Sequence, residues 1–278
     1  MALKNGLRVF IGPLLLLAIS YVIYAVRYPM WNITSPVELP YIGMFLTYFT
    51  IFAVALVLIK KDMKAKLTDI FKFKDTYVVL LGLLLAVLLN VLTFGFTSLL
   101  GGKMDPISFA SNTLASLPLA FTIYFLYGTF CSFAEEVAYR AYAQSIISSK
   151  YGFAVGIFGS SMFFSLQHIH VFQVSWLEWF FSTQFISVLL FGIFAGYFFM
   201  KSKGNLWAVV AFHVLVNIIA LALPIQGLPA QGSANSILIF WIVNILSYTV
   251  LLIILRILPF NKLMKMRKSE ADTLEQFN

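Results

Sequence analysis

Eight long apolar stretches, separated by charged, proline and turn residues, constrain this chain more than any other feature. They cover residues 9–26, 41–59, 77–100, 119–147, 152–169, 179–200, 206–224 and 237–258. All but the fourth are about 18–24 residues long, which lets a helix cross a hydrocarbon core of about 30 Å. The fourth is longer and must tilt, kink or project. Because lipid offers no partners for backbone amides and the hydrophobicity is unbroken, these stretches are expected to be helices rather than barrel strands.

The composition excludes a soluble globular protein. Hydrophobic residues make up 61% of the 278 residues and charged residues only 11%, whereas a soluble domain carries about 25% charged residues. We therefore predict an all-α, polytopic integral membrane protein with about eight transmembrane helices. The single cysteine, Cys131, excludes an intramolecular disulfide and a Cys-Cys zinc site.

The net charge of +8 comes mainly from Lys and Arg residues between the apolar stretches. This placement indicates membrane orientation rather than nucleic-acid binding. With the N-terminus in the cytoplasm, basic residues concentrate on the cytoplasmic side, including six lysines at 60–74, while Arg27 and Lys103 fall outside. Both termini are therefore expected to be cytoplasmic. The segment 60–74 is either an interfacial helix or an ordinary basic loop.

Three regions are expected along the chain. Residues 1–118 hold the first three helices and the basic cytoplasmic loop, and residues 119–224 hold helices four to seven. Residues 225–278 hold the last helix and a polar cytoplasmic tail.

Ionisable residues within the apolar stretches mark candidate functional positions, because each costs about 2.5–3.5 kcal/mol at the bilayer centre. The fourth stretch carries Glu135, Glu136 and Arg140. Glu136 and Arg140 are four residues apart and can form an ion pair on one helix face. Glu135 lies about 100° around the helix and lacks that partner. A desolvated carboxylate beside a second acid suits a general base that works near neutral pH.

Two further stretches carry imidazoles. His168 lies one turn after Phe164, whose ring can pack against it, and His213 lies one turn before Asn217. Counting ~1.5 Å per residue places Glu135, both imidazoles and the amide within about 12 Å in depth. Side-chain reach and helix tilt can close that difference. The four groups are expected to converge near mid-membrane, where they could activate water and stabilise an oxyanion.

The remaining polar and small residues of the apolar stretches are expected to serve packing or to lie at the interface. Asn90 and Asn244 are isolated in their stretches, His170 lies at a helix end, and Gly192 to Gly196 form a small-residue face.

Three motifs in this chain together resemble those of a known family. Glu-Glu-x-x-x-Arg at 135–140, Phe-x-x-x-His at 164–168 and His-x-x-x-Asn at 213–217 follow one another on successive apolar stretches. They resemble the motifs of the CPBP family, the CAAX-protease and bacteriocin-processing intramembrane proteases, also called the Abi family. The similar region runs from about residue 119 to 224. Tyr139 and Ala141 depart from the Phe and Gly that the family often has around the arginine.

The resemblance implies an intramembrane endopeptidase with a role for each motif residue. Glu135 would activate water, His168 would assist at the water or a metal, His213 and Asn217 would stabilise the oxyanion, and Glu136 and Arg140 would hold the site. Glu135, His168 and His213 could form a two-His-one-carboxylate set for Zn²⁺, although the local spacing is not His-Glu-x-x-His. The alternative is a metal-free mechanism that depends on the Glu135 carboxylate.

A membrane-embedded site suits a substrate that is tethered by lipid or by its own helix. A prenylated CAAX protein, a peptide pheromone or a bacteriocin precursor would each fit, and no nucleic-acid partner is expected. Short extramembrane loops favour a bacterial cell membrane. A membrane transporter or bacteriocin-immunity protein could use the same residues as a proton relay or binding site. We favour the protease, because cation pathways usually spread their acids over several helices and here they concentrate in one.

Overall fold

The computed structural model describes the backbone of residues 2–31, 38–73, 75–100, 103–104, 118–168, 183–222, 225–226 and 234–260. Side chains are described for residues 7–23, 45–73, 75–100, 125–126, 128–168, 185–219 and 238–260. Predictions for His170 and for the polar tail fall outside these ranges. The described residues are almost entirely helical. One short antiparallel pairing joins β1 (Lys103–Met104) to β2 (Ile225–Gln226).

Each of the eight apolar stretches is helical over most of its described residues. The elements are α1 (Ala2–Trp31), α2 (Glu38–Leu58), the π-helix η1 (Ile59–Met63), α3 (Leu67–Phe71), α4 (Thr76–Leu99), α6 (Pro118–Glu136), the π-helix η3 (Val137–Gln144), α7 (Ser145–Tyr151), α8 (Phe153–Gln167), α10 (Thr183–Lys201), α11 (Leu206–Ala222) and α12 (Ala234–Ile257). The fourth stretch contains three of these elements, α6, η3 and α7. The all-helical class is as predicted, while eight membrane crossings and cytoplasmic termini stay predictions.

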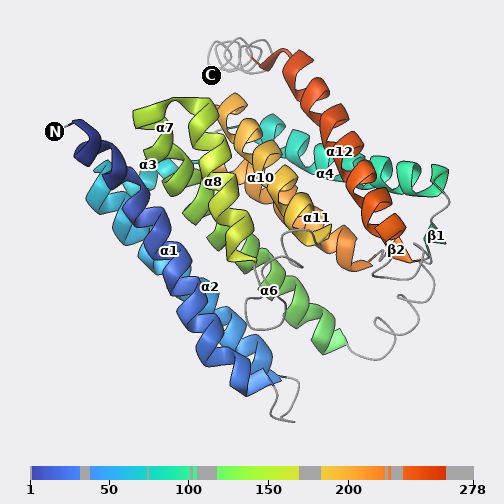
Figure 1. Ribbon diagram of the computed structural model, residues 1–278, viewed down its shortest axis with the longest axis horizontal. Helices are drawn as coiled ribbons and strands as arrows, with labels where there is room; N and C mark the ends of the chain where they lie inside the picture. The colour runs from blue at the N-terminus through green and yellow to red at the C-terminus, as the bar shows by residue number, and fades with distance from the viewer. Residues whose placement is uncertain are drawn as a thin grey trace, which may run out of the picture.

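The helices form a bundle with a central group and two flanking pairs (Figure 1). α1 and α2 pack together on one side, and α4 and α12 pack together on the other. Between them, α8 packs against α10, while α11 packs against both α4 and α6. The α6–η3 run therefore meets helices from both halves of the chain, which is where a site built from distant residues can form.

Turn chemistry sets where the central helices begin. Asp75 caps α4, because its Oδ1 accepts a hydrogen bond of 2.9 Å from the backbone N–H of Tyr77. Asn205 precedes α11, and its Oδ1 accepts a bond of 3.3 Å from the N–H of Ala208. The turn before it places Gly204 at a φ of +72°, a backbone conformation that glycine adopts without steric cost.

The outer surface is strongly apolar. Leu84 and Val91 of α4 are 62% and 57% exposed, and α1, α2 and α12 also present large hydrophobic side chains outward. Two described helical segments are long and apolar enough to cross a bilayer by themselves, Thr76–Leu99 and Leu238–Ile257, with mean hydropathies of 2.6 and 2.5. Four shorter described segments are also apolar. An apolar surface of this extent is typical of a protein that contacts lipid.

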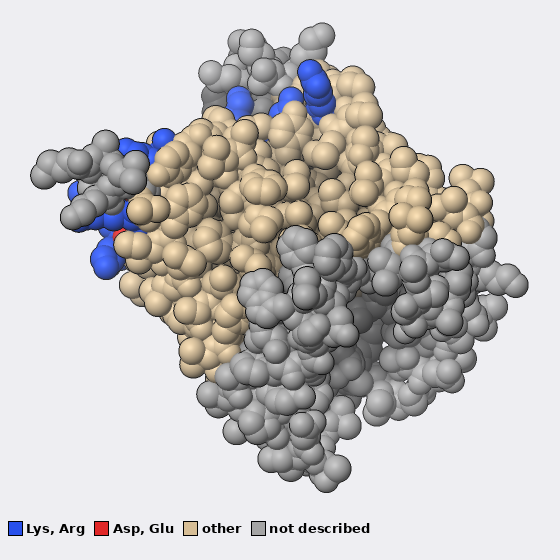
Figure 2. All heavy atoms as spheres, in the orientation of Figure 1, with Lys and Arg blue, Asp and Glu red and all other residues tan. Residues whose placement is uncertain are grey.

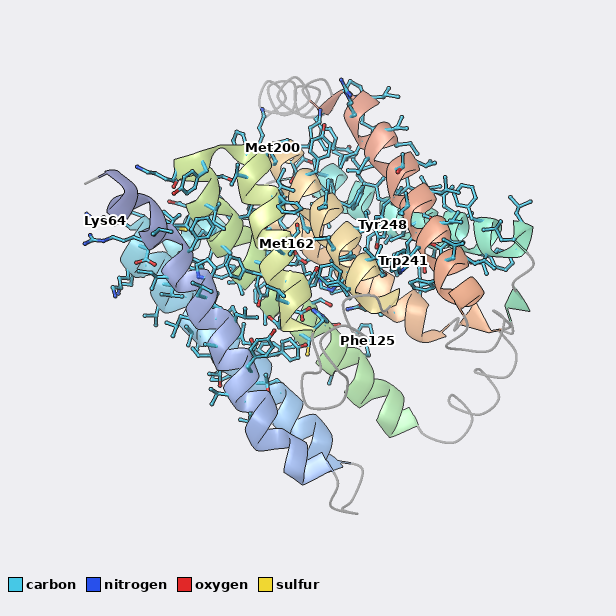
Figure 3. The ribbon with its side chains drawn as sticks, viewed as in Figure 1. Lys64, Phe125, Met162, Met200, Trp241 and Tyr248 are labelled. Atoms are coloured by element: carbon cyan, nitrogen blue, oxygen red, sulfur yellow. The ribbon has the colours of Figure 1, made fainter. Side chains whose placement is uncertain are left out.

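Basic side chains occupy particular edges of the bundle. Figure 2 shows Lys and Arg gathered near the α3 end and near the ends of α7 and α12, with a continuous uncharged surface between them. Lys64 projects from the edge near α3, whereas Tyr248 lies inside, 6.2 Å from the ring of Phe194 (Figure 3). In the basic segment, Phe71 of α3 packs on Phe133 at 5.9 Å, so this short helix is anchored to the bundle.

Small residues allow the central helices to approach one another. A side chain on Gly192 of α10 would meet the Ser161 side chain of α8 at 2.9 Å. One on Gly196 would lie 2.7 Å from the amide oxygen of Gln144 in η3. The small-residue face that the sequence indicated between 192 and 196 is thus a packing surface against α8 and η3.

Candidate active site

The two acids of the fourth stretch lie where the helix changes its winding. α6 ends at Glu136 and continues without a break into η3, so Glu135 and Glu136 are the last α-helical residues. Short π-helical segments are rare and occur frequently at functional sites. The fourth stretch therefore changes its winding directly after the two acids, which hydrophobicity alone did not indicate.

Glu136 is shared between two partners. Its Oε2 accepts a hydrogen bond of 3.1 Å from Nε of Arg140, and both side chains are fully buried. Its Oε1 lies 2.8 Å from Nδ1 of His213 on α11. Because a carboxylate accepts, Nδ1 of His213 carries the hydrogen in this contact. The contact fixes the ring orientation and leaves Nε2 directed to the other side, toward Glu135.

The two imidazoles approach Glu135 from different helices. Nε2 of His213 lies 3.7 Å from its Oε2, and Nε2 of His168 lies 3.7 Å from its Oε1. His168 follows the last residue of α8, and its Nδ1 lies 2.8 Å from the backbone oxygen of Phe164. Since a carbonyl oxygen accepts, this Nδ1 also carries a hydrogen. Both rings therefore present Nε2 to one carboxylate.

Phe164 organises the aromatic wall around these groups. Its ring lies 4.7 Å from that of His168 in a T-shaped contact, as the spacing between them indicated. The guanidinium carbon of Arg140 lies 5.2 Å above the same ring, and Phe191 lies 4.5 Å from the ring of His213. This dry wall keeps the local dielectric low, so charge interactions inside are stronger than in water.

Asn217 is turned toward α6 but not toward Glu135. Its Nδ2 donates a hydrogen bond of 3.0 Å to Oγ of Ser132, which in turn donates to the backbone oxygen of Gly128 at 2.8 Å. Asn217 and His213 thus face Ser132 and Glu136, one turn apart on each helix. The structure brings Glu135, Glu136, Arg140, His168 and His213 into one cluster. Asn217 instead contacts Ser132, one helical turn before Glu136 on α6. The role of Asn217 in binding an oxyanion stays a prediction.

Sequence reasoning missed several polar residues of this cluster. Nε2 of Gln167 donates to Oε1 of Glu135 at 3.2 Å, and the hydroxyl of Tyr139 donates to Oε1 of Gln167. The sequence could have indicated Gln167, because an amide side chain next to His168 in an apolar stretch needs a hydrogen-bond partner, just as that of Asn217 does.

The donor atoms at Glu135 match zinc in type. Two imidazole nitrogens face one carboxylate, and each ring is oriented by an acceptor on its other nitrogen, as is usual for metal-ligating histidines. Among the described residues, however, no three His, Cys, Asp or Glu side chains are grouped in the geometry of a metal centre. A metal therefore stays a prediction.

A family comparison covers this same part of the chain. Residues 116–219 match the family model described as type II CAAX prenyl endopeptidase, Rce1-like. This segment is therefore similar to that family over somewhat more than a third of the chain. All three motifs lie within it, and the predicted resemblance to the CPBP proteases is confirmed. No curated protein matches the chain.

The similarity of residues 116–219 to this family supports protease activity in general. Together with the apolar helices, it indicates an integral membrane protein. The family match covers residues 116–219, so α1, α2 and α4 lie outside it.

Proposed function

We propose that this chain is an intramembrane endopeptidase that hydrolyses a peptide bond in a membrane-associated or lipidated protein or peptide. The observation that carries the proposal is the approach of both imidazole Nε2 atoms to the two oxygens of Glu135, each at 3.7 Å. These distances exceed a direct hydrogen bond. A water between the rings and the carboxylate would be in reach of a base and of two nitrogens that can donate or accept.

In this mechanism the Glu135 carboxylate takes a proton from the attacking water. The water oxygen forms a bond to the carbonyl carbon of the substrate, and the carbonyl oxygen becomes an oxyanion. The proton held on Glu135 then passes to the leaving amine as the C–N bond breaks. His168 would orient the water, since it is the more exposed of the two histidines, 23% against 5% for the side chains.

His213 can serve in one of two ways, because its Nδ1 is held by Glu136. As the imidazolium it carries a hydrogen on Nε2 and would donate to the oxyanion, with Asn217 as the second donor. As the neutral ring it offers a lone pair to a metal. A Zn²⁺ ion held by Glu135, His168 and His213 would supply a Lewis acid for the attacked carbonyl and the water.

The decisive experiment compares the wild-type protein, Glu135→Gln and Asp69→Asn, each purified in detergent, on a panel of membrane-tethered peptides. Glu135→Gln keeps the shape and removes the base, so turnover is expected to fall by about 10³-fold or more. Asp69→Asn makes the same chemical change on the exposed α3 and should leave turnover unchanged. Full activity in Glu135→Gln would remove this residue from the role of base.

The metal is tested on the same preparations. If zinc takes part, the protein should carry about one equivalent, a chelator should abolish cleavage, and added zinc should restore it. Cleavage that survives metal removal but is lost in Glu135→Gln favours the carboxylate mechanism. If the wild-type protein cleaves no peptide while Glu135→Gln blocks proton-coupled uptake or bacteriocin resistance, the transporter or immunity function replaces the protease.

We further propose that both termini and the basic segment 60–74 face the cytoplasm of a bacterial cell. The argument is electrostatic, because positive side chains near helix ends favour the cytoplasmic side. A prenylated CAAX protein, a pheromone and a bacteriocin precursor all belong in the peptide panel, since each is a tethered substrate.

A further inference from the structure

A buried chain of hydrogen bonds ends at the proposed base. The Tyr139 hydroxyl, from η3, donates to Oε1 of Gln167 at the end of α8. Nε2 of Gln167 then donates to Oε1 of Glu135 at 3.2 Å. The three residues are 0%, 3% and 4% exposed, so bulk water does not compete for these bonds.

The chemistry of the Gln167 amide fixes the direction of donation along this series of hydrogen bonds. A carboxylate in its basic form only accepts hydrogen bonds, so Gln167 must turn its NH₂ group to Glu135. Its oxygen then points away and needs a donor, which Tyr139 supplies. If the amide were reversed, its oxygen would face a carboxylate oxygen, and two buried acceptors would repel each other. The Glu135 carboxylate therefore sets the orientation of Gln167, and the Tyr139 hydroxyl holds the amide there by donating to its oxygen.

The bond from Gln167 is the shorter of the contacts measured at Oε1 of Glu135. It spans 3.2 Å, whereas Nε2 of His168 lies 3.7 Å from the same oxygen. The imidazoles therefore leave room for a bridging group, and the amide of Gln167 is the donor that orients the carboxylate at this oxygen.

We propose that Gln167 is a positioning residue that holds the Glu135 carboxylate toward the attacking water, and that Tyr139 is a positioning residue that fixes Gln167. The inference rests on the proposed function, because it assigns these residues a part in the same reaction. A misplacement of a base by a fraction of an ångström lowers the rate of the chemical step without weakening substrate binding. The effect should therefore appear in kcat rather than in KM.

Tyr139 also packs, and the test must separate packing from hydrogen bonding. Its ring contacts that of Phe164 edge to face at 5.4 Å. Tyr139→Phe keeps the ring and removes only the hydroxyl oxygen. Tyr142→Phe is a matched control, since Tyr142 lies in the same η3, is also buried, and bonds through its hydroxyl to Oδ2 of Asp62 at 2.6 Å. That bond lies outside the candidate site.

The experiment is a double-mutant cycle on the full chain in detergent, with kcat, KM and thermal midpoint measured for each variant. We expect Tyr139→Phe to lower kcat by about 10-fold at unchanged KM, and Gln167→Met to lower it by at least as much. The double variant should be no slower than Gln167→Met, because Tyr139 acts only through Gln167. Tyr142→Phe should change the thermal midpoint and leave kcat unchanged.

Three results would overturn the inference: wild-type kcat in Tyr139→Phe, losses that multiply in the double variant, or an equal loss of kcat in Tyr142→Phe. If Gln167→Met does not fold, the comparison of kcat between Tyr139→Phe and Tyr142→Phe still tests the inference, because each variant removes only one hydroxyl oxygen. Failure of the proposed function is read separately, from turnover that persists in Glu135→Gln. If activity requires Glu135 but not the Tyr139 hydroxyl, the proposed function stands and this inference is wrong.

Discussion

Side-chain amides are satisfied differently in the α4–α12 pair and in the junction of α6, η3, α8 and α11. In the pair, Asn90 and Asn244 each donate at 2.8 Å to the carbonyl oxygen four residues earlier on their own helix. At the junction, Asn217 donates to Ser132 and Gln167 donates to Glu135, each on a neighbouring helix. An amide that bonds its own helix is satisfied before the helices assemble, whereas one that reaches a neighbour depends on their assembly.

This difference distinguishes polar residues that serve packing from polar residues that are candidates for function. α4 and α12 pack together, and one described side-chain hydrogen bond joins them, between the hydroxyls of Thr93 and Ser247 at 3.4 Å. The junction instead concentrates two acids, an arginine and two imidazoles. Nη1 and Nη2 of Arg140 are buried without a hydrogen-bond partner among the described residues, which is costly. Such an arrangement is poorly explained by stability alone.

The largest expected effect on stability at the junction comes from Arg140→Ala. The change leaves Glu136 as a buried carboxylate with His213 as its remaining partner, so the free energy of unfolding should fall by about 3–5 kcal/mol. Fluorescence-detected size-exclusion chromatography and thermal melts would measure the loss. Replacing both charges, Glu136→Gln with Arg140→Met, should recover much of the expression. Equal stability of Arg140→Ala and wild type would show that the pair does not support the junction.

Variants of the two histidines should differ in their effect on stability while both lower the rate of the reaction. His168→Ala and His213→Ala are each expected to lower kcat by about 10²-fold or more, since both rings face Glu135. His213→Ala should also lower the thermal midpoint, because its Nδ1 bonds the buried Glu136, whereas His168 bonds only a backbone oxygen through its Nδ1. Paired kinetic and melting measurements on both variants would check this. The same thermal loss in both would contradict the difference in their surroundings.

The smallest effect tests the comparison of the amides directly. Asn217→Leu should lower kcat by about 10-fold if its amide helps to bind the oxyanion. Asn244→Leu makes the same change in α12, removes a bond within one helix, and should leave kcat unchanged. Both variants are assayed with one peptide at saturation. If the two have equal activity, Asn217 belongs with the packing residues and the oxyanion donor must be sought elsewhere.

Part of this molecule follows from local sequence. The apolar stretches indicated the helices, because length and hydrophobicity act within each segment. The pair Glu136 and Arg140 was also local, since residues four apart share a helix face. The three motifs indicated the family, and the match at residues 116–219 agrees with them. That the imidazoles would approach Glu135 was an expectation from depth, which the contacts at 3.7 Å support.

Only the tertiary structure decided how these groups meet. The bond from His213 to Glu136 and the bond from Asn217 to Ser132 both depend on how α6 and α11 are aligned. The π-helical winding that begins at Val137 was not indicated by the hydrophobic pattern. Gln167 became visible as a partner of Glu135 only when α8 was placed beside α6. A helix shifted by one residue turns each side chain by about 100°, so the same sequence elements could have met differently. Hydrophobicity determines that a segment is an apolar helix, whereas interhelical contacts determine which of its faces are buried and what they meet.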